Sequence, residues 1–204
     1  MRVVVPFGVR SPKTRLDSLF SLEERRELAV AMLRDVLDAL CGHDPVVVAD
    51  APFEASLDVP VELDDRPLTE AVAARLGGDE PIAVVMSDLA LATPESISRL
   101  FETRGDIVAA PGLGGGTNAL VVRHPEFTVD YHGASIRDHR RIARDIGATM
   151  TELDSMRLAI DIDEPRDLAE VLIHGEGHAR AWLVEAGVEL HDSGSRVTSR
   201  RNRR

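Results

Sequence analysis

Short runs of apolar residues alternate with longer segments of helical periodicity along this sequence, and this alternation constrains the fold more than any other feature. The apolar runs occupy residues 2–5, 46–49, 82–86, 107–110, 119–122 and 158–160. Continuous apolar runs of this length predict strands that are buried on both faces, as in sheets covered by helices on each side. The sequence therefore predicts an α/β fold built around a mainly parallel sheet.

Capping residues mark the expected helix boundaries. Ser21 and Glu24 form a capping-box pattern ahead of apolar residues spaced four apart, and Gly42 is the expected stop. Thr93 is the expected N-cap of another helix, with Pro94 at its first position. Further helices are expected at residues 69–76, 135–146 and 165–173.

The length of 204 residues suits one domain with a sizeable core, and no internal repeat is present. We expect one domain over residues 1–190 and a flexible, arginine-rich tail over residues 191–204. A single cysteine, Cys41, excludes a disulfide framework within one chain. No apolar run approaches the roughly 20 residues of a membrane span, and the first residues lack a signal-peptide pattern. We therefore expect a cytoplasmic protein with no membrane partner.

The charge balance argues against a nucleic-acid partner. The chain has 35 acidic and 24 basic residues, and five of the arginines lie in the tail with one aspartate. Residues 1–190 therefore hold 34 acidic and 19 basic side chains, a net charge of −15 that would repel nucleic acid. Lys13 is the only lysine. This composition favours a halophilic archaeal protein, because molar salt screens the repulsion. A genome rich in arginine codons is the alternative.

Ligands of open α/β sheets bind beyond the carboxyl ends of the strands, so polar residues at those positions are the candidate site. The first such segment, residues 11–15, carries Lys13 and Arg15, two cations that suit a polyphosphate. An ordinary solvated loop is the alternative. The segment matches neither the Walker A pattern nor the dinucleotide-binding glycine pattern.

Three carboxylates follow two of the expected strands. Asp88 follows residues 82–86, and Asp161 and Asp163 follow residues 158–160. Alternation along a strand would place Asp161 and Asp163 on one face. Carboxylates suit Mg²⁺, whereas Asp88 could instead cap a turn and Asp163 could cap the helix expected at residues 165–173. Asp161 is then the better partner of Asp88 on one Mg²⁺.

Two further segments are typical of anion-binding loops. Residues 112–118 are rich in glycine, which allows close backbone approach and a run of exposed N–H groups, although a flexible hairpin loop would look the same. In residues 131–139, Ser135 could cap its helix or present its hydroxyl to a phosphate, with His139 one turn later. Together these features indicate Mg²⁺-assisted phosphoryl or nucleotidyl transfer.

Several segments also match a known family in order along residues 2–175. They are Pro12-Lys13-Thr14-Arg15-Leu16, Ser21-x-x-Glu24-Arg25, Ser87-Asp88-Leu89, Gly115-Gly116-Thr117-Asn118-Ala119-Leu120, Gly133-x-Ser135-x-x-x-His139 and Asp161-Ile162-Asp163-x-Pro165-x-Asp167-Leu168. This pattern resembles that of the 2-phospho-L-lactate guanylyltransferases, the CofC proteins of archaea. The resemblance implies a single Rossmann-like nucleotidyltransferase domain with a mainly parallel, partly mixed central sheet. It also implies a homodimer, which no visible surface patch in the sequence indicates by itself.

The resemblance implies a reaction in coenzyme F-420 biosynthesis. GTP and 2-phospholactate would give lactyl-2-diphospho-5'-guanosine and pyrophosphate. Bacterial relatives use phosphoenolpyruvate, so that acid is an alternative substrate. A nucleotide-binding regulatory domain without turnover is the alternative from another functional class.

The resemblance also implies roles for individual residues. The candidate catalytic residues are Lys13, Arg15, Asp88 and Asp161. Mg²⁺ would be bound by Asp88, Asp161 and Asp163. The nucleotide would contact Lys13, Gly115 and Gly116. The phosphorylated acid would contact Thr117, Asn118, Gly133, Ser135 and His139.

Overall fold

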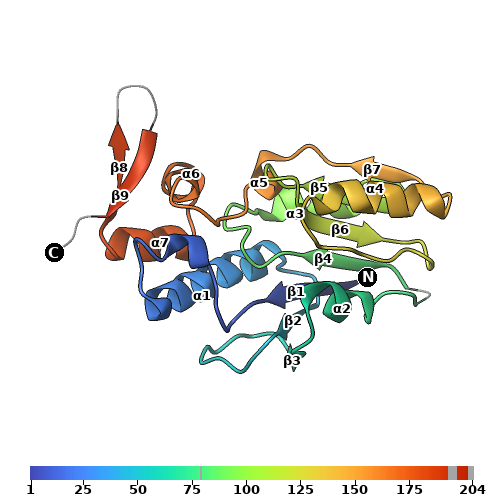
Figure 1. Cartoon of the computed structure of the whole chain (residues 1–204), viewed down its shortest axis with the longest axis horizontal. Coiled ribbons are helices and arrows are strands. Elements are labelled where there is room, and N and C mark those ends of the chain that lie inside the picture. Colours follow the sequence, from blue (N-terminus) through green and yellow to red (C-terminus); the bar gives the residue numbers. More distant parts are fainter. Residues whose placement is uncertain (79, 193–196, 202–204) are drawn as a thin grey trace.

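The computed structural model describes residues 1–78, 80–192 and 197–201. Its centre is a seven-stranded sheet of order β3-β2-β1-β4-β6-β5-β7 (Figure 1). The strands are β1 (Arg2–Phe7), β2 (Pro45–Ala49), β3 (Val61–Leu63), β4 (Ile82–Val85), β5 (Ile107–Pro111), β6 (Thr117–Val122) and β7 (Met150–Glu152). Only β6 runs antiparallel to its neighbours β4 and β5 among these strands. The predicted mainly parallel, partly mixed sheet is therefore confirmed.

Helices cover both faces of this sheet. They are α1 (Leu22–Ala39), α2 (Leu68–Ala73), α3 (Pro94–Glu102), α4 (Ser135–Asp145), α5 (Met156–Ala159), α6 (Asp167–His174) and α7 (His178–Glu185), and a short 3-10 helix spans Thr14–Leu16. Side chains alternate across each strand, so Val3 and Val5 join one core with α1, α3, α6 and α7. Val4 joins a second core with α2 and α4 on the opposite face. The continuous apolar strands arise from this burial on both sides.

The predicted helix starts are confirmed where capping residues marked them. The Ser21 side chain accepts from the N–H of Glu24, and the Glu24 side chain accepts from the N–H of Ser21. Thr93 caps α3 with Pro94 in its first turn. Gly42 follows α1 with a φ of 86°, which glycine adopts without the steric cost of a Cβ.

The expected strand at residues 158–160 is wrong, because this segment contains the end of the short helix α5. The N–H groups of Leu158 and Ala159 both donate to the carbonyl of Ser155, which closes a helical turn. Strand β7, which the sequence pattern did not reveal, pairs with β5 at that edge of the sheet instead. A three-residue apolar run is too short to distinguish a buried helical turn from a strand.

The start of α6 also differs from the expected one. The helix begins at Asp167 rather than at residue 165, and its N-cap is Arg166. Asp163 does not cap it. The Asp167 side chain accepts from the N–H groups of Asp163 and Glu164, and this closes the turn before the helix.

Part of the arginine-rich tail belongs to a second, two-stranded sheet. Strand β8 (Val188–Asp192) pairs antiparallel with β9 (Val197–Arg201), and this hairpin stands away from the central sheet (Figure 1). The Arg201 guanidinium lies 5.0 Å from the centre of the Phe20 ring and is hydrogen-bonded to Glu24. Residues 197–201 of the arginine-rich tail thus form a strand, while residues 193–196 and 202–204 lie outside the described residues. Of the helices described, none has the length and apolar character of a membrane span.

Candidate active site

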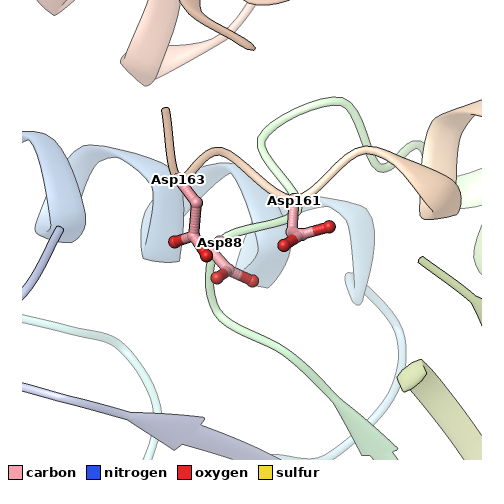
Figure 2. Close-up of side chains that lie close together, drawn as sticks. All are labelled: Asp88, Asp161 and Asp163. Carbon is pink, nitrogen blue, oxygen red and sulfur yellow. The ribbon is translucent and has the colours of Figure 1, made fainter. Parts of the chain in front are cut away.

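Three carboxylates converge beyond the end of β4. Asp88 lies in the loop after β4, and Asp161 and Asp163 lie in the segment that joins α5 to α6 (Figure 2). One oxygen from each lies within 4.8 Å of the others. The N–H of Ile162 donates to the carbonyl of Asp88 at 3.3 Å, and the Ile162 side chain is fully buried. Ile162 thus anchors this segment beside Asp88, so the expected meeting of carboxylates holds although Asp161 follows a helix, not a strand.

Lys13 is the cation of this cluster. Its Nζ lies 2.7 Å from Asp88 Oδ2 and 2.8 Å from Asp163 Oδ1, and its side chain is 10% exposed. Burial alone would lower the pKa of Lys13, but the charges of Asp88 and Asp163 raise it above its usual value. Lys13 also has a left-handed backbone with a φ of 51°, a conformation that is costly for a residue with a Cβ. A strained backbone therefore directs the buried ammonium at the carboxylates.

Arg15 lies at the rim of the cluster. Its Nη1 is 3.5 Å from Asp163 Oδ2, and its side chain is 66% exposed. A guanidinium held this loosely remains free to turn toward an anion arriving from solvent.

Asn118 holds Asp161 in place. Its Nδ2 donates to Asp161 Oδ1 at 3.2 Å and to the carbonyl of Leu158 at 2.9 Å. Gly112 lies against this amide, and a Cβ at Gly112 would come within 2.5 Å of Asn118 Oδ1. The structure therefore brings Asn118 to the carboxylates rather than to the hydroxyl groups of Thr117 and Ser135.

The carboxylate cluster fits a divalent cation. Asp88 Oδ1 is buried and has no hydrogen-bond partner among the described residues. Burial, followed by the charge of Asp88, raises the pKa of Asp161 above its usual value. Three carboxylates with one lysine leave an excess of negative charge, and carboxylate oxygens are the ligands that Mg²⁺ prefers. A hard cation would satisfy both the orphaned oxygen and this excess.

The glycine-rich loop has fewer free N–H groups than expected. The N–H groups of Gly112 and Gly115 donate to the carbonyls of Gly116 and Gly112, and that of Leu113 donates to Ala159. Gly115 adopts a φ of 86°, which the turn requires. The N–H of Ile136 donates to the Gly115 carbonyl, so the loop is fixed against the start of α4. The N–H of Gly115, expected to face the nucleotide, is thus used within the loop.

A second cluster lies at the start of β6 and α4. Thr117, Ser135 and His139 are all buried, and His139 is 0% exposed. Thr117 Oγ1 lies 2.9 Å from His139 Nδ1, and Ser135 Oγ donates to Thr117 Oγ1 at 3.2 Å. Burial lowers the pKa of His139 to about 4. Gly133 makes the turn before α4 with a φ of 56° and open space around it.

A cavity of about 470 Å³ opens beside Lys13 and Asp88. Its lining includes residues that the sequence reasoning missed, among them Arg10, Asp50, Asp64 and Arg66. Asp50 follows β2 directly, so the rule that ligands bind beyond strand ends would have found it. Asp64 and Arg66 follow β3, a strand too short to be recognised from its pattern.

Comparisons with known proteins show the family of this chain. A family model described as "Guanylyl transferase CofC like" matches residues 1–204. A protein of Haloferax volcanii named 2-phospho-L-lactate guanylyltransferase is 67% identical, with both chains covered completely. A protein of the same name from Halomicrobium mukohataei is 60% identical over 98% of this chain and all of its own length.

Solved structures share the fold at low sequence identity. A protein of Desulfovibrio desulfuricans described as a nucleotide-diphospho-sugar transferase matches with a TM-score of 0.70 and 16% identity, over 90% of this chain and 94% of its own. A CMP:2-keto-3-deoxy-manno-octonic acid synthetase in complex with CTP matches with a TM-score of 0.52 and 11% identity, over 90% and 98%. The Rossmann-like nucleotidyltransferase fold is thereby confirmed. With a family model that spans the whole chain and relatives at 60–67% identity, this chain belongs to the CofC-like family of guanylyl transferases.

Proposed function

We propose that this protein transfers the guanylyl group of GTP to 2-phospho-L-lactate in coenzyme F-420 biosynthesis. The observation that carries the proposal is the cluster of three carboxylates around Lys13, beside a cavity at the carboxyl ends of β1 and β4. The name of the relatives from Haloferax volcanii and Halomicrobium mukohataei supports the choice of acid and of nucleotide.

The proposed reaction is an in-line displacement at the α-phosphorus of GTP. A phosphate oxygen of 2-phospholactate forms the new P–O bond, the bond between the α-phosphorus and the bridging oxygen breaks, and pyrophosphate leaves. Both reactants are anionic, so their mutual repulsion opposes attack. Lys13 and Arg15 lie where they can offset the charge of the triphosphate, Lys13 as a fixed ammonium and Arg15 as a mobile fork.

The proposed metal ligands are Asp88 and Asp161, with Asp163 beside them. When bound, Mg²⁺ would supply charge neutralisation for the reacting phosphates. Asp163 and one oxygen of Asp88 are already paired with Lys13. The other oxygen of Asp88 lacks a partner among the described residues, and Asp161 is held by an uncharged amide. These differences favour Asp88 and Asp161 as the principal ligands.

The proposed site for the phosphorylated acid is formed by Thr117 and Ser135, with Gly133 in the preceding turn. Ser135 is the first residue of α4, and the N-cap Ala134 has no side chain that could satisfy the first N–H groups of the helix. The positive end of a helix dipole attracts anions. The N–H of Ile136 at this end already donates to the carbonyl of Gly115. The N–H of Met86 donates to the carbonyl of Asn118, which places the start of β6 beside the end of β4 and hence beside Asp88.

Pyrophosphate release tests this function. GTP, ATP and CTP are each offered with 2-phospholactate or phosphoenolpyruvate, in Mg²⁺ and high salt. We expect release with GTP and 2-phospholactate. Faster pyrophosphate release with phosphoenolpyruvate would make that compound the acid substrate. GTP binding without pyrophosphate release in the presence of either acid would favour the regulatory alternative.

We also propose that the protein acts in the cytoplasm, as a homodimer, in a salt-rich cell. The acidic composition with one lysine supports the salt-rich setting. The dimer is proposed from the family resemblance, and light scattering in molar salt measures it directly.

A further inference from the structure

A buried imidazole lies directly behind the two hydroxyl groups proposed to bind the acid. His139 is 0% exposed, so it has no surface with which to touch a substrate. Its Nδ1 lies 2.9 Å from Thr117 Oγ1, and that oxygen also accepts from Ser135 Oγ at 3.2 Å. His139 can therefore act on a bound acid only indirectly, and Thr117 is the proposed acid-binding residue whose hydroxyl group it contacts.

The backbone fixes which nitrogen of His139 carries the proton. The N–H of Asp130 donates to His139 Nε2 at 3.1 Å. A backbone N–H can only donate, so Nε2 must offer its lone pair, and the proton of the neutral ring then lies on Nδ1. The rings of Phe127 and Tyr131, with centres 5.9 Å and 5.2 Å from that of His139, hold the imidazole in an apolar setting that keeps it neutral.

The position of this proton decides how many hydroxyl hydrogens remain for a ligand. When Nδ1 donates to Thr117, one of the two hydroxyl hydrogens forms the hydrogen bond between Thr117 and Ser135. The other hydroxyl hydrogen then remains free to donate to a ligand. When Nδ1 instead accepts, Thr117 donates to the ring, Ser135 donates to Thr117, and none is left. The observed contact of Asp130 with Nε2 selects the first arrangement.

We propose that His139 is a positioning residue, which donates from Nδ1 so that the Thr117–Ser135 pair presents one hydroxyl hydrogen to an anionic oxygen of the acid substrate. The inference rests on the proposed binding of the acid at Thr117 and Ser135. It gives His139 an indirect role in place of the direct substrate contact expected from the sequence.

Two variants at His139 separate its donor function from its bulk. His139→Leu keeps most of the volume but removes the donor, whereas the amide of His139→Asn retains a donor near the place of Nδ1. We expect His139→Leu to raise the KM for 2-phospholactate about tenfold, the usual effect of one lost hydrogen bond, with the KM for GTP unchanged. We expect His139→Asn to stay within about threefold of the native KM. Ile136→Val, which alters a buried apolar side chain on the same helix, is the control for altered packing.

A double-mutant cycle distinguishes this inference from the proposed function. Thr117→Val alone should raise the KM for the acid, and an unchanged KM would overturn the acid site itself. In the Thr117→Val background, His139→Leu should add nothing, because the hydroxyl that it orients is gone. Full additivity of the two effects would leave the acid site standing and overturn the positioning role.

A spectroscopic measurement decides the matter even if a variant fails to fold. In native protein labelled with ¹⁵N-histidine, we expect the His139 ring to be neutral with its proton on Nδ1 at neutral pH. The His139 signal is identified as the one that is missing from the spectrum of His139→Asn. It is also identified as the ring N–H that exchanges slowly with solvent because it is buried. A ring protonated on Nε2, or on both nitrogens, would overturn the proposal.

Discussion

Lys13 Nζ and Asp88 Oδ2 lie 2.7 Å apart, so the only lysine of the chain is the ion-pair partner of a proposed metal ligand. The other oxygen of Asp88 is buried without a partner in the described part of the chain. Asp88 can therefore contact Lys13 through one oxygen and a cation through the other. This relationship places the proposed nucleotide contact and the proposed metal on opposite sides of one carboxylate.

Replacing Lys13 should lower the free energy of unfolding of the metal-free protein. Lys13→Met removes the cation paired with both Asp88 and Asp163, and loss of one partner of a largely buried ion pair destabilises a protein. We expect the free energy of unfolding to fall by about 2 kcal/mol, less than for a fully buried pair because Asp163 is partly exposed. Urea unfolding in the presence of a chelator measures it. Lys13→Arg is the charge-matched control, and equal stability of Lys13→Met and native protein would contradict the ion-pair account.

The three carboxylates should differ in their effect on turnover. Asp88→Asn and Asp161→Asn should each lower kcat by about 10²-fold or more, comparable with the loss of one preorganised electrostatic group. Asp163→Asn should lower it less, because Asp163 is already paired with Lys13 and is more exposed. Steady-state pyrophosphate release measures all three. A normal Asp161→Asn beside an inactive Asp163→Asn would reverse the choice between these two ligands.

In the metal-free protein, the ionised Asp161 side chain should lower the free energy of unfolding at neutral pH. The pKa of Asp161 is raised above its usual 3.8, so the folded chain binds this proton more tightly than the unfolded chain does. The cost therefore grows as pH rises through 3.8 and is complete above the folded pKa. We expect metal-free Asp161→Asn to be at least as stable as native protein at pH 7, with the difference vanishing below about pH 4. Denaturant unfolding at several pH values checks this, and a large loss of stability at pH 7 would refute it.

The last described strand should stabilise the start of α1. Arg201 is hydrogen-bonded to Glu24 and to the carbonyl of Leu19, and the hydrogen bond from Arg201 lowers the pKa of Glu24 to about 2. This contribution is complete above the usual pKa of 4.5 and is lost as pH falls toward 2. We expect Arg201→Met to cost about 1 kcal/mol at pH 7 and progressively less in acid. Arg200→Met on the same strand is the control. Equal stabilities of the two variants at pH 7 would show that the hairpin does not support α1.

The layout of the sheet could be predicted from sequence because its strands are buried on both faces and its helix caps are local. Ser21 and Thr93 fix helix starts through hydrogen bonds to residues three positions away. By contrast, β3 and β7 are three-residue edge strands, whose pairing depends on the neighbouring strand rather than on their own sequence. The apolar run at residues 158–160, where α5 ends, is too short to distinguish a helical turn from a strand.

The convergence of Asp88, Asp161 and Asp163 could be predicted from sequence, but the contacts that surround them could not. Asp88 follows β4, and the carboxyl ends of strands are where this fold class places ligands, whereas Asp161 follows the helix α5. The attachment of Asn118 to Asp161 spans 43 residues and depends on the close approach of Gly112. The contact of His139 with Thr117 spans 22 residues. Such long-range contacts leave no periodic signal in a single sequence.

The most direct test of the central claim is mass-spectrometric detection of the product. Native protein is incubated with GTP, 2-phospholactate and Mg²⁺ in high salt, with Asp161→Asn and a chelator-treated sample beside it. The account predicts lactyl-2-diphospho-5'-guanosine together with an equal amount of pyrophosphate, both strongly reduced in the two controls. Folded native protein that binds GTP yet forms no guanylylated acid would contradict it.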